Sequence, residues 1–208
     1  MKRLRPSALI AVAVGLVVVV YFATRPRYPS DRTPEGAYLR IAKAVTEGRA
    51  ADFFPYIETA AQHAAYTIRD YRRAARARVL ATFPEPDRSR LAAEYEREGA
   101  APDGADVFAL FAGRRGWLGV LRRDLSGIAK VDVRGDRASV ETVRGTRYPF
   151  RRRENGIWGI TLFTPVLVAE AEKAARDLSM IERAARDYER ARSSDARRAR
   201  SGDGGTRP

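Results

Sequence analysis

A long uncharged run near the N-terminus sets the strongest limit on what this chain can fold into. It extends from Ser7 to Thr24 and is apolar almost throughout. At about 1.5 Å per residue, a helix of this length spans roughly 27 Å, close to the hydrocarbon thickness of a bilayer. Basic residues flank the run on both sides. We therefore predict that residues 7–24 form a transmembrane helix within a membrane anchor, residues 1–27, and that the rest of the chain folds separately.

The end of this run favours an uncleaved signal-anchor over a cleaved signal peptide. Cleavage needs small residues before the cut, but Tyr21 and Phe22 stand there and Arg25-Pro26 follows. A cleaved signal peptide is the alternative, whereas a lipoprotein is excluded because the chain has no cysteine. More basic residues precede the run than closely follow it. This bias favours a single-pass protein of the inner membrane, with residues 28–208 on the periplasmic side.

The net charge of +13 is spread along the chain rather than gathered in one place. Residues 1–27 carry +5, residues 28–182 carry +4, and residues 183–208 carry +4. Such a distribution is typical of a solvated surface, so we expect no nucleic-acid site. The basic ends could still attract anionic lipid headgroups without specificity.

Helical periodicity dominates the chain as far as about residue 125. Thr33-Pro34 is typical of a helix start, and Asp52 is expected to be the N-cap of a second helix. Pro84 and Pro86 end that helical stretch. The apolar face of the second helix is expected to contain Ala61, Ala64, Ile68, Tyr71, Ala75 and Val79.

The hydrophobic period then falls to about two. Short apolar runs alternate with turn signals, of which Asn155-Gly156 is the strongest because both of its positions accept positive φ. The expected strands are residues 128–133, 137–143, 146–153 and 157–163. Helices followed by a meander predict an α+β domain in which helices cover one face of a four-stranded antiparallel sheet.

A long amphipathic helix is predicted after the sheet, over residues 164–192. Its apolar residues step by four and three in a heptad stripe. We expect this stripe to pack on its own domain, with self-association as the alternative. The following residues, 193–208, are rich in Ser, Arg and Gly and are predicted to form a disordered basic tail. The residues that would carry self-association are Leu167, Leu178, Ile181 and Tyr188.

Three stretches resemble the nuclear-transport-factor-2-like (NTF2-like) superfamily. They are the helical entry TPEGAYLRIAKAVTEGRAADFFPYI, the strand pair KVDVRGDRASVETV and the ending RRENGIWGITLF. The resemblance covers about residues 33–163 and implies that the domain, residues 28–163, is a cone in which a helix pair closes a curved antiparallel sheet. Members of the superfamily include small-molecule enzymes and noncatalytic binding or assembly modules. Some bacterial members are anchored in the membrane by one N-terminal helix. The long helix after the sheet is a departure from this pattern.

Acid–base chemistry has one candidate cluster in this sequence. His63, Tyr66 and Asp70 share one side of the second helix, and a His–Asp pair beside a tyrosine could transfer protons in a pocket. The competing interpretation is a partly solvated helix edge. His63 is the chain's single histidine, which excludes a multi-histidine metal site, so we expect no metal and no cofactor.

Six aromatic residues are candidates for a ligand pocket, although core packing is the simpler role for each. Two further motifs have structural explanations: Arg134-Gly135-Asp136 matches a hairpin turn, and strand alternation divides Arg151-Arg152-Arg153 between two faces. Neither is assigned a function from the sequence. The six aromatic candidates are Tyr66, Tyr71, Phe108, Trp117, Tyr148 and Trp158.

The leading hypothesis is a noncatalytic binding or assembly module outside the cytoplasm. A cone-fold enzyme that uses His63 and Asp70 is one alternative. A protein that binds anionic lipid surfaces through its Arg-rich ends is the other.

Overall fold

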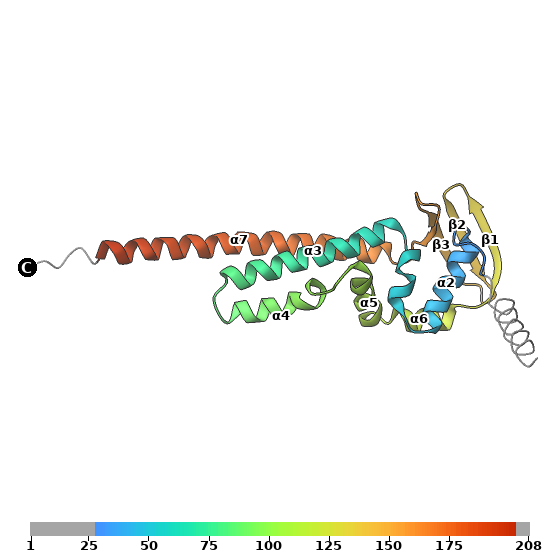
Figure 1. The fold of residues 1–208 in the computed structure, drawn as a ribbon, viewed down its shortest axis with the longest axis horizontal. Coiled ribbons are helices and arrows are strands. Elements are labelled where there is room, and N and C mark those ends of the chain that lie inside the picture. The colour runs from blue at the N-terminus through green and yellow to red at the C-terminus, as the bar shows by residue number, and fades with distance from the viewer. Residues whose placement is uncertain (1–27, 203–208) are drawn as a thin grey trace, which may run out of the picture.

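The computed structural model describes residues 28–202, with side chains over residues 28–198. Over this range the chain is α+β, with helices preceding and following a four-stranded antiparallel sheet (Figure 1). The predicted transmembrane helix, residues 7–24, lies outside the described range, and no helix within that range is long and apolar enough to cross a membrane. The elements are α2 (Pro34–Thr46), η1 (Ala50–Tyr56, a 3₁₀ helix), α3 (Thr59–Thr82), α4 (Asp87–Gly99), α5 (Gly104–Arg114), α6 (Trp117–Asp124), β1 (Ile128–Arg134), β2 (Arg137–Thr142), β3 (Arg147–Arg152), β4 (Trp158–Ile160) and α7 (Thr164–Gly202).

Helix α2 begins as its sequence predicts. The hydroxyl of Thr33 accepts a hydrogen bond from the backbone N–H of Gly36 at 3.2 Å, and Pro34 occupies the first turn, where no N–H is needed. The buried face of α2 contacts β1, β2 and β4, so this helix covers one face of the sheet. The large side chains on that buried face are Tyr38, Ile41 and Val45.

The sheet is a simple meander in the order β1-β2-β3-β4, as predicted. Its inner face is apolar, with Val140 and Phe150 buried beneath the helices. Strand β1 is a free edge, on which Val133 is 53% exposed. The other edge is covered, because Ile57 forms a parallel bridge with Ile160 of β4. The opposite face of the sheet carries mostly charged side chains.

The described part of the molecule has two hydrophobic clusters, which we call the head and the arm. The head comprises α2, η1, α5, α6 and the sheet, together with the first parts of α3 and α7. The arm comprises residues 72–99 and 177–202, in which α3 lies alongside both α4 and α7. Figure 1 shows the sheet at one end of the molecule and α7 extending beyond α3 and α4 at the other. With 39 residues, α7 is about 58 Å long.

Two sequence predictions about helix boundaries are wrong. Asp52 does not cap a long helix but lies inside η1, where it pairs with Arg49 at 2.9 Å. The predicted disordered tail also begins too early, because α7 continues through residues 193–202. In that segment Ser193 and Ser194 turn their hydroxyls back to main-chain carbonyls of the preceding turn, so they do not interrupt the helix.

Candidate functional site

The predicted acid–base cluster lies on an exposed face of α3. His63 and Asp70 are both exposed, and Asp70 accepts a hydrogen bond from its neighbour Arg69 at 2.9 Å. Tyr66 packs its ring edge-on against Phe54, with the Arg69 guanidinium 5.3 Å from its centre. Solvent therefore surrounds the imidazole and the carboxylate. This arrangement gives neither group the dry, enclosed setting in which acid–base catalysis is efficient.

The six aromatic candidates do not share a pocket. Phe108, Tyr148 and Trp158 are buried in the head. Trp117 is half-buried against Phe163, with ring centres 4.7 Å apart. Tyr66 is exposed, and Tyr71 is half-buried immediately before the arm begins.

Their hydrogen bonds agree with a packing role. The indole Nε1 of Trp158 donates to the carbonyl of Arg32 at 3.1 Å, which ties the segment before α2 to the sheet. Tyr148 has no hydrogen-bond partner for its buried hydroxyl within the described residues. Burial, with a smaller contribution from the charge of Asp124, raises the pKa of Tyr148 to about 12.

A hollow of about 530 Å³ lies where the head meets the arm, between α3, α4, α5 and α7. Its floor includes Ile68 and Phe111, and its walls carry charged side chains. Three of the arginines in its walls form ion pairs, and one of these pairs, Arg114–Glu98, joins the head to the arm. Its ion pairs are Arg72–Asp177 at 2.6 Å, Arg114–Glu98 at 3.1 Å and Arg115–Glu170 at 2.7 Å.

A second hollow, of about 570 Å³, lies on the open face of the sheet. Four arginines line it, and the two carboxylates in its lining are Glu58 and Asp132. Glu58 is only 8% exposed; its carboxylate accepts hydrogen bonds from the hydroxyl of Thr164 at 2.7 Å and from Arg151 at 3.0 Å. Its cations outnumber its carboxylates two to one. The four arginines are Arg134, Arg137, Arg147 and Arg151.

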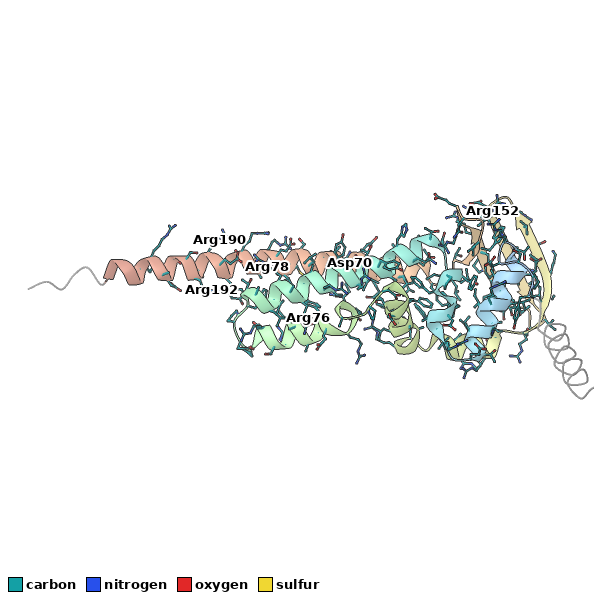
Figure 2. All side chains as sticks on the ribbon, viewed as in Figure 1. Asp70, Arg76, Arg78, Arg152, Arg190 and Arg192 are labelled. Atoms are coloured by element: carbon teal, nitrogen blue, oxygen red, sulfur yellow. The ribbon has the colours of Figure 1, made fainter. Side chains whose placement is uncertain are left out.

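Sequence reasoning missed this basic face although the signal was present. A two-residue turn places its flanking residues opposite each other, so Gly135-Asp136 puts Arg134 beside Arg137. The alternation predicted for the arginine triplet is confirmed for Arg151, which pairs with Gly159, and Arg152, which pairs with Trp158, whereas Arg153 lies beyond the end of β3. Figure 2 shows Arg152 at the sheet end of the molecule, far from Asp70 and from the arm's Arg76, Arg78, Arg190 and Arg192. Register, not spacing along the chain, gathers the arginines of the open face.

Comparison with known protein-family models, curated proteins and solved structures finds no match to this chain. Within the described residues, no group of three or more His, Asp or Glu side chains could hold a metal ion.

Proposed function

We propose that this protein is a noncatalytic binding or assembly module, anchored in the inner membrane by residues 7–24 with residues 28–208 on the periplasmic side. The observation that carries the proposal is the arm, a helical projection that has its own apolar cluster and extends beyond the packed interior of the head. Asp31 and Arg32 are tied by their carbonyls to Trp158 in the sheet, so the chain enters at the end opposite the tip of α7. The arm thus extends away from the end of the molecule at which the described chain begins.

The filled interior of the head supports a noncatalytic role. Phe53, Phe108 and Phe163 are buried and contact one another, with ring centres between 4.9 and 5.9 Å apart. The ring of Trp117 packs against Phe108 and Phe163 of the same group. A cone that bound a small substrate would need this volume for its ligand. Binding is accordingly proposed for the outer surfaces.

The resemblance to NTF2-like proteins is retained as part of this proposal, for the head only. Helix α2 on one face of an antiparallel meander is what that superfamily implies. Helix α3 departs from the pattern, because it leaves the sheet and packs along α4 and α7. We infer that the arm is an elaboration added to a small cone-type domain.

Site-specific photocrosslinking in the cells that naturally produce the protein tests the assembly role. Leu80 on α3 and Met180 on α7 are apolar but 45% and 51% exposed on the arm, so a photoreactive residue at either position is expected to give a discrete adduct with another protein. Val120 on α6, 46% exposed on the head, is the matched control and is expected to give none. If neither arm position gives a discrete adduct, the assembly role is wrong.

The orientation is tested separately. Alkaline phosphatase fused after residue 208 folds only in an oxidising compartment, so we expect an active fusion. An inactive fusion that becomes active when residues 1–27 are replaced by a known secretion signal would place the arm in the cytoplasm and overturn the proposed location.

A further inference from the structure

Three arginines form a row across the open face of the sheet. In the strand register Arg134 of β1 pairs with Arg137 of β2, and Arg137 pairs in turn with Arg151 of β3. Paired residues in an antiparallel sheet project from the same face. The next row along, Val133, Ala138 and Phe150, projects from the apolar side. The three guanidinium groups therefore stand side by side over two strand spacings, about 9.6 Å.

Within the described part of the chain, only one of the three arginines in this row has a carboxylate partner. Arg151 is held by the buried Glu58 at 3.0 Å and by Asp136 at 3.5 Å. Within the described side chains, by contrast, Arg134 and Arg137 form no ion pair with a carboxylate. Like charges placed directly opposite each other destabilise a sheet. A destabilising arrangement kept at one place on a well-formed sheet is typical of a functional site.

The surroundings of the row suit an oxyanion that carries more than one charge. Ser139 lies two rows along, on the same face as the arginines, and Thr161 lines the same hollow, so hydroxyl donors stand near the guanidinium groups. Asp132 also lines the hollow, but Lys130 neutralises it at 3.1 Å. Arginine forks bind phosphate oxygens through paired, charge-assisted hydrogen bonds. A single carboxylate would pair with one guanidinium group, whereas a phosphate-bearing anion can accept hydrogen bonds from two neighbouring guanidinium groups at once.

We propose that Arg134, Arg137 and Arg151 form a binding site for phosphate groups on the open face of the sheet. Glu58, fixed by Thr164, holds Arg151 in position, while Arg134 and Arg137 supply the free charge. The phosphate can belong to a soluble anion or to a phospholipid headgroup. The second source is reasonable because the chain leads towards residues 7–24 from the same end of the molecule as the sheet. This site is independent of the arm and of its proposed partner.

Titration of the full chain in neutral detergent micelles tests the site. The probes are inorganic pyrophosphate and two short-chain lipids, dihexanoyl phosphatidylglycerol and dihexanoyl phosphatidylcholine. We expect pyrophosphate or phosphatidylglycerol to bind, and R134Q/R137Q to raise the dissociation constant at least tenfold, because two charge-assisted contacts are lost. Binding of pyrophosphate alone identifies a soluble anion, and selective binding of phosphatidylglycerol identifies a headgroup; either result supports the site.

A matched control separates a site from general attraction to a basic protein. R183Q/R186Q removes the same charge from exposed positions on the arm and is expected to bind like wild type. The thermal midpoint without ligand gives a second measurement: R134Q/R137Q is expected to melt at the wild-type temperature or above it, since like-charge repulsion is relieved. The proposal is overturned if no probe binds to the wild type, or if both double variants weaken binding equally.

Discussion

At the scale of single residues, Tyr38 and Tyr148 are two buried phenols in opposite hydrogen-bonding states. Their ring centres lie 5.8 Å apart. The hydroxyl of Tyr38 donates to the carbonyl of Ser126 at 2.6 Å and accepts from the Ser126 N–H at 3.1 Å. Tyr148 has no such partner within the described residues. We expect Y38F to lower the free energy of unfolding by about 1–2 kcal/mol and Y148F to leave it unchanged or raise it by up to about 1 kcal/mol, as measured by urea denaturation.

The raised pKa of Tyr148 makes the same pair sensitive to alkali. In the folded chain this phenol stays neutral up to a pKa of about 12, whereas in the unfolded chain it ionises near its ordinary value of 10.0. Its contribution to stability is therefore complete below pH 10 and is lost as the pH rises towards 12. Burial raises the pKa of Tyr38 as well, so Y148F should reduce the alkaline loss without abolishing it. Thermal midpoints of both proteins between about pH 9 and pH 12 measure this, and equal slopes would contradict it.

At the scale of elements, one nearly buried ion pair fastens α7 to α3. Arg72 and Asp177 meet at 2.6 Å, with side chains 11% and 15% exposed, and the guanidinium lies 5.0 Å from the centre of the Tyr95 ring. D177N leaves Arg72 without its counter-charge and should cost about 3 kcal/mol of unfolding free energy. The double variant R72M/D177L, which replaces the pair with apolar side chains of similar size, should recover most of that loss. A D177N variant as stable as wild type in urea would show that the ion pair does not stabilise the packing of α7 on α3.

Helices α3 and α7 also show which buried residues the local sequence pattern predicts and which it misses. The heptad stripe correctly predicts that Ile181 and Ala185 are buried, because one helix face is fully encoded by spacing. On α3 the prediction includes Tyr71, but the structure leaves Tyr71 half-buried and buries Arg72 instead. A period of 3.6 cannot reveal that Asp177, on another helix, neutralises that arginine. The end of α7 was predicted too early for a related reason, since Ser and Arg composition suggests disorder while Ala and Arg propensity sustains a helix.

At the scale of the whole molecule, the division into head and arm was not predicted. Each strand and turn of the meander follows from local alternation and from Gly-containing turns, and the sheet accordingly agrees with prediction. The course of α3 depends instead on which distant helices offer it an apolar face. Phe83, Tyr95 and Tyr188 come from three separate parts of the chain to close the arm. The basic row on the sheet is missed in the same way, because it exists only once three strands are in register.

Because the apolar stripe of α7 packs within its own chain, we expect the protein to be a monomer. Leu167 and Ile181 are buried, and Leu178 and Tyr188 pack on the arm's own cluster, so the stripe that could have joined two copies is already covered. We expect light scattering on residues 28–208, which contain both clusters, to give the mass of one chain over a hundredfold range of concentration. L178D should then lower stability without changing that mass, because Leu178 packs inside its own arm. A dimer in the wild type that L178D separates into monomers would show instead that the stripe pairs between copies, and the arm would then be a dimerisation element.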